Sequence, residues 1–231
     1  MTERIVTGEE MKRLDMQTIE HGIPSLVLME RAALASVEVL RDEGFDLERV
    51  LVICGPGNNG GDGIAVARLL HLAGRRVRVV FVGDPGRCSE ETSKQQEIAE
   101  SYGLRIEAFP DLIRNDSAGE DAVFDEFATA DRATTVVDAI FGIGSIRAPE
   151  GDFLKAIRYI NEKRDAGMKV LSLDIPSGVC ANTGSAPGEA VRADATVTFA
   201  YKKAGLTRLP GRKLAGRVIV KDIGIYAEGE K

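Results

Sequence analysis

The chain has 231 residues, of which 44% are hydrophobic and 29% are charged, enough to bury a sizeable core, and its formal net charge is −6. This acidic balance argues against a nucleic-acid-binding surface, and no apolar run reaches the roughly 20 residues of a membrane helix. The three cysteines never occur in CxxC spacing, which argues against a disulfide framework or a zinc site. With no signal-peptide core at its N-terminus, the chain is expected to be cytoplasmic.

Two helices are predicted before the first strand. Thr7 and Glu10 form a capping-box pattern that begins the first helix, and Gly22 ends it. Pro24 begins the second helix, which runs to Gly44. The pair is apolar enough to pack on its own sheet or against a second copy of the chain, and the sequence leaves both open.

Strands and helices then alternate along the rest of the chain. Strands are predicted over 49–54, 77–82, 105–109, 134–140, 169–175, 194–199 and 217–222, and helices over 62–73, 89–102, 120–130 and 150–165. Several strands are nearly continuous in Val, Ile and Leu, which is typical of a sheet covered on both faces. The alternation predicts a mainly parallel sheet in an α/β fold, with residues 1–231 forming a single domain.

Residues 55–63, Gly-Pro-Gly-Asn-Asn-Gly-Gly-Asp-Gly, hold five glycines between a strand and a helix. Glycines can adopt positive φ and bring backbone N–H groups close to a ligand, and a helix N-terminus attracts phosphate. The segment matches GxGxxG, with Asp84 after the next strand, but Pro56 is unusual in that motif. A plain turn capped by Asp62 would need only one glycine, so we interpret the segment as a ligand-binding loop.

Two more strands end in a carboxylate followed by glycine. Asp138 precedes Gly142, and Asp174 precedes Ser177 and a further glycine. Each Asp alone could be a turn former, but ligands of open α/β sheets bind at the carboxyl ends of strands, so together they predict one site. Carboxylates without Lys, His or Cys in these loops fit general acid/base chemistry. The oxygens of Asn59, Asp138 and Ser177 suit a hard cation.

At these motifs the sequence resembles the NAD(P)H-hydrate epimerase family, the YjeF N-terminal-type domain. The matching segments are 22–30, 58–63, 138–144 with Arg147 and Gly151 beyond it, 174–178, 193–199 and 203–206. They occur in the right order over nearly the whole chain. The resemblance implies a Rossmann-like three-layer α/β/α sandwich with the N-terminal helix pair, usually a homodimer. It also implies interconversion of the R and S forms of hydrated NADH and NADPH at C6 of the nicotinamide ring.

The resemblance assigns roles to individual residues. The substrate would be held by Asn58, Asn59, Gly60, Gly61, Asp62, Gly142, Ile143, Gly144, Ser145, Ile146, Arg147, Ala148 and Asp174. A potassium ion (K+) would be bound by Asn59, Asp138 and Ser177, and Asp138 would also be the catalytic acid/base. Many relatives carry a fused ATP- or ADP-dependent dehydratase domain, for which this chain is too short, so a separate dehydratase is expected to consume the S form.

The chain departs from the family pattern at two positions. Ile143 stands where Thr is usual, so its loop is expected to bind through the backbone, and Arg31 stands where Asn is more frequent, on a helix face outside the site. A generic dehydrogenase is one alternative, but nothing beyond position 190 supplies a hydride-transfer residue. An inactive scaffold of the same fold is the other. The basic segment 201–213 is interpreted as a solvated loop near the sheet edge.

Overall fold

A computed structural model describes residues 4–109, 133–144 and 147–226. One sheet has the order β4-β3-β2-β5-β6-β7-β9, and every pairing in it is parallel. Its strands are β2 (Arg49–Cys54), β3 (Arg76–Phe81), β4 (Ile106–Ala108), β5 (Thr135–Ala139), β6 (Lys169–Leu173), β7 (Ala195–Phe199) and β9 (Arg217–Lys221). All the predicted strands are thus confirmed. The chain builds the sheet outward from β2 to β4 and then returns to place β5 on the other side of β2, which makes β2 and β5 the topological switch point.

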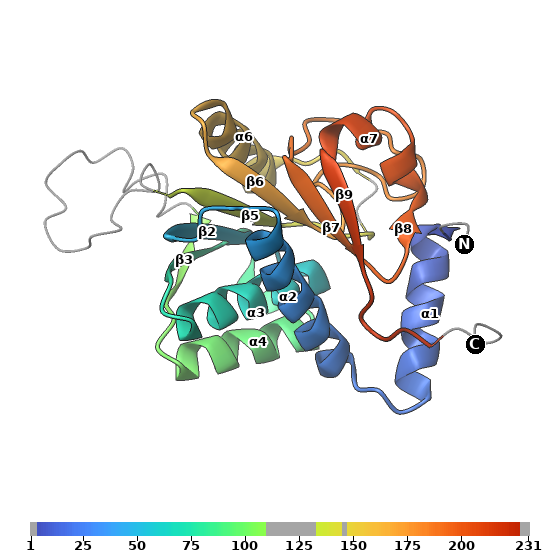
Figure 1. Cartoon of the computed structure of the whole chain (residues 1–231), viewed down its shortest axis with the longest axis horizontal. Coiled ribbons are helices and arrows are strands. Elements are labelled where there is room, and N and C mark those ends of the chain that lie inside the picture. The colour runs from blue at the N-terminus through green and yellow to red at the C-terminus, as the bar shows by residue number, and fades with distance from the viewer. Residues whose placement is uncertain (1–3, 110–132, 145–146, 227–231) are drawn as a thin grey trace, which may run out of the picture.

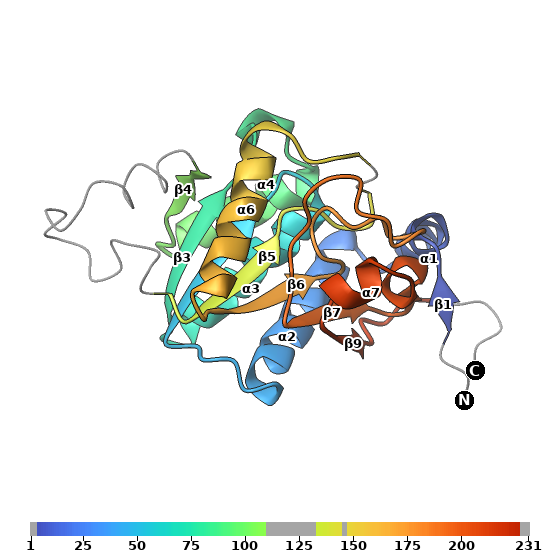
Figure 2. The same ribbon diagram turned by 90° about the horizontal axis from the view of Figure 1, so that it is seen from above.

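Helices cover both faces of this sheet. α6 (Gly151–Asp165) lies on one face, and α2 (Ser25–Asp42), α3 (Asn58–Leu72) and α4 (Glu90–Ser101) lie on the other (Figures 1 and 2). α1 (Gly8–Glu20) stands beside the sheet (Figure 1). The predicted three-layer sandwich is confirmed, whereas the helix predicted over 120–130 lies outside the described residues.

The core follows from the alternation of side chains along the strands. Val50 and Val52 of β2 point into the layer shared with α2 and α3, and Leu51 and Ile53 point into the layer shared with α6. All four side chains are fully buried. A strand that is apolar on both faces is therefore required here, as its sequence predicts.

Several short elements lie beside the main sheet. β1 (Ile5–Val6) pairs in parallel with β8 (Lys202–Lys203), which is followed by a 3₁₀ turn (Ala204–Thr207) and α7 (Gly211–Leu214), and another 3₁₀ turn (Pro85–Arg87) follows β3. Two-residue strands carry no periodic signal, so the sequence did not predict them. None of the helices in the described ranges has both the length and the apolar character needed to cross a bilayer.

Candidate functional site

A cavity of about 1250 Å³ opens at the carboxyl edge of β2, β5 and β6. Its walls come from the loops that follow these strands, from the first turn of α3, and from α1 and α2. The predicted substrate-binding residues that line it are Asn58, Asn59, Asp62, Gly142, Ile143, Gly144, Arg147, Ala148 and Asp174. Three separate strand ends therefore converge on one cavity, as the sequence predicted.

The remaining predicted residues lie elsewhere. Gly60 and Gly61 are buried in the first turn of α3, behind the cavity wall. Asp138 and Ser177 are fully buried and do not line the cavity. Ser145 and Ile146 fall outside the described residues.

The glycine-rich segment is not a loop of positive φ angles, which corrects the expectation from the sequence. None of its five glycines has a positive φ, and α3 already begins at Asn58. The glycines instead permit close approach: a Cβ at Gly60 would lie 1.8 Å from the backbone oxygen of Gly55, and one at Gly63 would lie 2.4 Å from the Cβ of Ala139. They let α3 pack directly on the ends of β2 and β5.

This packing directs the N-terminus of α3 at the cavity. The N-cap residue is Gly57, no side chain in the described part of the chain caps the helix, and Asn58 and Asn59 of the first turn line the cavity. Uncapped N–H groups at a helix start, with the helix dipole behind them, attract an anion such as phosphate. The cations of Lys12 and Arg147 line the same cavity.

Asp138 has both carboxylate oxygens occupied by donors. Its Oδ2 accepts from Ser172 Oγ at 2.7 Å and from the Ser177 backbone N–H at 2.9 Å. Its Oδ1 accepts from Ser177 Oγ at 2.6 Å and from the Ile140 N–H at 3.4 Å. Burial raises the pKa of Asp138, and the hydrogen bonds from Ser177 oppose this rise. This geometry favours a carboxyl that ties the end of β5 to β6, and the acid/base role of Asp138 stays a prediction.

The predicted cation ligands share the backbone of Phe141. Asn59 Nδ2 donates to the Phe141 carbonyl at 3.0 Å, and the Phe141 N–H donates to Ser177 Oγ at 2.9 Å. Asn59 Oδ1 is buried and accepts no hydrogen bond from any residue that the structure describes. Ser177 Oγ lies 3.5 Å from the same Phe141 carbonyl and donates to Asp138, so a carbonyl, a hydroxyl and a carboxylate belong to one network with Asn59. A bound cation would satisfy the buried Asn59 Oδ1, so the oxygen donors present fit one.

Asp174 is paired with a lysine that sequence reasoning missed. Its backbone has φ of +64°, rare for a residue other than glycine and typical of strained functional positions. Lys203 Nζ lies 2.7 Å from Asp174 Oδ1 and also donates to the Phe199 carbonyl at 2.8 Å. The Lys203 side chain is 1% exposed, so the expectation of a solvated loop over 201–213 is wrong at this residue. The sequence feature that could have marked Lys203 as a site residue is its position just beyond the end of β7, the strand next to β6.

Two further carboxyl groups face the cavity without a partner. Asp15 of α1 and Asp62 of α3 both line it, and within the described ranges neither carboxyl has a hydrogen bond or an ion pair. Burial raises the pKa of Asp15 to about 6, with Lys203 lowering it and Asp174 adding to the rise. Burial also raises the pKa of Asp62 well above its ordinary value, and the charges of Asp174 and Asp15 reinforce this.

The two departures from the family pattern have different surroundings. Ile143 lines the cavity and packs against the apolar cluster that contains Met11 and Leu14 of α1. Arg31 is exposed on α2, does not line the cavity, and rests against Gly224, where a Cβ would lie 1.8 Å from its Nη1. Ile143 therefore affects the wall of the cavity, and Arg31 lies outside it, as expected.

Relatives that match nearly the whole chain carry the same name. An NAD(P)H-hydrate epimerase of Limosilactobacillus reuteri (strain ATCC 55730 / SD2112) is 46% identical over 98% of this chain and 99% of the relative. An NAD(P)H-hydrate epimerase of Weissella koreensis is 45% identical over 97% of this chain and 93% of the relative. The crystal structure of yeast YNL200c superposes with a TM-score of 0.72 at 19% identity, covering 95% of this chain and 88% of that one, and shows the same fold.

A family described as YjeF-related protein N-terminus matches residues 25–205. This range holds the glycine-rich turn of α3, the end of β5, Asp174 and Lys203, so it spans most of the cavity and leaves out α1. The chain belongs to the family of YjeF-related protein N-termini.

Proposed function

We propose that this chain is an NAD(P)H-hydrate epimerase, an isomerase that interconverts the R and S forms of hydrated NADH and NADPH at C6 of the nicotinamide ring. The similarity to relatives of that name over almost the full length of both chains carries the proposal. The cavity at the switch point of a parallel sheet supports it, because nucleotides bind there in this class of fold.

The cavity offers separate contacts for the two parts of such a substrate. The first turn of α3, together with Lys12 and Arg147, would hold the diphosphate. The hydrated nicotinamide would then lie toward Asp174 and Asp62, where polar side chains face the cavity. The backbone of Gly142, Ile143 and Gly144 would contact it.

The reaction itself is an elimination followed by an addition. C6 of the hydrate carries a hydroxyl beside N1, so protonation of that hydroxyl lets it leave as water while the N1 electron pair forms a planar cation. Water that returns to the opposite face gives the other epimer. Such chemistry needs a proton donor and a proton acceptor at the ring and no redox partner.

The bound cation belongs to the same proposal. Asn59, Asp138 and Ser177 would hold K+, with the Phe141 carbonyl beside them. A bound cation would satisfy the unpaired Asn59 Oδ1 and supply positive charge near the substrate.

The proposed function also involves a second enzyme, a cellular compartment and a second copy of this chain. A separate ATP- or ADP-dependent dehydratase would consume the S form in the cytoplasm. The chain would form a homodimer through the apolar side chains exposed around the α1–α2 connection, which are Met16, Ile19, Ile23 and Val27.

The test of the function is a coupled assay. Both epimers of the hydrate are mixed with an S-specific dehydratase, with and without this protein. Complete consumption of the mixture only when the protein is present is the expected result. If the R form persists at its uncatalysed rate, the chain is an inactive scaffold of the same fold.

A further inference from the structure

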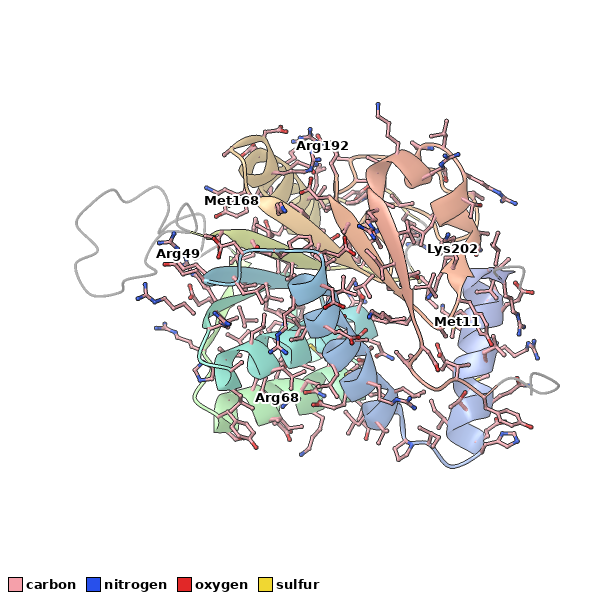
Figure 3. The ribbon with its side chains drawn as sticks, viewed as in Figure 1. Met11, Arg49, Arg68, Met168, Arg192 and Lys202 are labelled. Carbon is pink, nitrogen blue, oxygen red and sulfur yellow. The ribbon has the colours of Figure 1, made fainter. Side chains whose placement is uncertain are left out.

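α1 forms a wall of the cavity although it lies outside the segment that matches the family. Met11, Lys12, Asp15 and Ile19 recur at helical spacing along one side of α1 and all line the cavity. Met11 lies on the side of α1 that is turned toward the sheet (Figure 3). This helix therefore belongs to the site and is more than a packing element.

Contacts near both ends of α1 hold it in place. At its start, the Gly8 N–H donates to Asn182 Oδ1 at 2.7 Å, and β1 pairs with β8. At its end, the Tyr226 N–H donates to Thr18 Oγ1 at 2.8 Å, and the Tyr226 ring stacks on His21 with centroids 4.0 Å apart. Because the helix is fixed at both ends, the Asp15 side chain projects from a rigid support, as a reacting group requires.

The carboxyl groups of the cavity differ in their pairing. Asp174 is held by the Lys203 ammonium, while Asp15 and Asp62 have no such partner within the described residues. Lys203 is itself almost completely buried, and its ammonium charge also acts on Asp15 and Asp62. The other charged side chains that line the cavity are Lys12, Glu91, Arg147 and Glu150.

An epimerisation by loss and return of water needs one protonated and one ionised group at the ring. Two neighbouring carboxyls can supply such a pair when their surroundings keep one protonated and the other ionised. Asp174, whose carboxyl pairs with the Lys203 ammonium, is the proton acceptor of the pair. Burial brings the pKa of Asp15 to about 6, close to neutrality, whereas the pKa of Asp62 is raised well above its ordinary value, which suits a fixed hydrogen-bond donor.

We propose that Asp15 and Asp174 are the two proton-carrying residues of the reaction, Asp15 acting on one face of the nicotinamide ring from α1 and Asp174 on the other from the end of β6. The inference rests on the proposed epimerase function and goes beyond it by moving proton transfer from Asp138 to the cavity. Lys203 is the positioning residue that holds Asp174.

The two carboxyls carry one proton between them throughout the reaction. Asp15 gives its proton to the C6 hydroxyl oxygen, the C6–O bond breaks with its electron pair leaving in water, and the N1 lone pair forms the N1–C6 double bond. A water then attacks C6 from the other face, the N1–C6 π electrons return to N1, and the extra proton of that water passes to Asp174. One forward turnover leaves Asp174 protonated and Asp15 ionised, so a proton passes from Asp174 back to Asp15 through water before the next turnover in the same direction. In the reverse direction the two residues exchange roles, and the active form always holds one proton in the pair.

The test compares the parent chain with three variants on each purified epimer of the NADH hydrate between pH 5.5 and 8.5, with the uncatalysed rate subtracted. The variants are Asp15→Asn, Asp15→Glu and Glu20→Gln, the last a matched amide substitution at an exposed position of α1 that does not line the cavity. We expect Asp15→Asn to lower kcat by about 100-fold or more with KM changed less than about threefold. Asp15→Glu should restore part of the rate, and Glu20→Gln should match the parent.

The pH profile separates proton transfer from a structural effect. In the parent, kcat/KM should fall as the pH rises above about 6, when the shared proton is lost, and Asp15→Asn should lack this limb. A parent-like rate and profile in Asp15→Asn, a loss confined to KM, or an equal loss in Glu20→Gln would each overturn the proposal while the epimerase function stands. Failure of the parent chain itself to epimerise the hydrate would overturn both.

Discussion

The carboxyl groups of Asp138 and Asp15 lie at the same end of the sheet but in opposite environments. Asp138 is fully buried and receives four hydrogen bonds from the ends of β5 and β6. Asp15 receives none within the described ranges and faces a cavity. A carboxyl saturated with donors is fixed in place, while one with free oxygens can exchange a proton, so hydrogen bonding separates two residues that the sequence alone presents as the same type.

The free carboxyls come at a cost in folding free energy. Unpaired charge in a poorly solvated site destabilises the folded state, and such groups persist at sites that need them. The comparison therefore predicts opposite effects on stability: removal of the Asp138 carboxyl should destabilise the protein, and neutralisation of Asp15 should stabilise it at neutral pH.

Asp138→Ala should have the largest effect. It leaves the buried donors of Ser172 and Ser177 without an acceptor, so we expect the free energy of unfolding to fall by about 3 kcal/mol. Urea denaturation at pH 7 measures the change. Ser172→Ala, which removes only one of these hydrogen bonds, is the graded control and should lose about 1 kcal/mol. Losses of the same size in both variants would contradict the view that Asp138 ties the two strand ends together.

Asp15→Asn should stabilise the protein at neutral pH. The pKa of Asp15 is raised from 3.8 to about 6 on folding, so the folded state binds its proton more tightly than the unfolded state does. The contribution of this group to stability is full below pH 3.8 and is lost as the pH rises through about 6. Since the side chain is half-buried, we expect the amide to gain only about 1 kcal/mol at pH 7.5.

Thermal unfolding of this variant and of the parent at pH 4 and pH 7.5 measures the gain. It should shrink toward zero at pH 4, and Glu20→Gln should show no gain at either pH. A variant less stable than the parent at pH 7.5 would mean that Asp15 has a stabilising partner, and would break the contrast with Asp138.

The sequence predicted the strands and loops that form the site better than it predicted the residues proposed to carry out the reaction. Runs of Val, Ile and Leu marked several strands of the main sheet, and the residues that follow β2, β5 and β6 were placed together because parallel strands end at one edge. The start of α3 was missed because Asn58 through Gly61 have low helix propensity, and packing against the strand ends overrides it.

Lys203 and Asp15 could not be found by local reasoning. Lys203 has the sequence context of one more charge in a basic segment, and only its ion pair with Asp174 shows that its side chain is buried at the cavity. Asp15 lies within a helical pattern whose apolar residues indicate packing only. A polar residue that interrupts the apolar side of a helix was the available signal, and only the tertiary arrangement shows that this side faces a cavity.

The smallest expected effect concerns the proposed cation. If Asn59, Asp138 and Ser177 hold K+, replacing 100 mM choline chloride with 100 mM KCl should raise the free energy of unfolding by at most about 1 kcal/mol. Asn59→Ala, which removes the unpaired Oδ1, should abolish the response, and Asn58→Ala should keep it. Asp15→Asn should keep it too, because its carboxyl takes no part in the Asn59–Phe141–Ser177 network. A K+ response lost in Asp15→Asn would place the cation in the cavity beside Asp15. It would then contradict the separation between the hydrogen-bonded Asp138 and the cavity-facing Asp15.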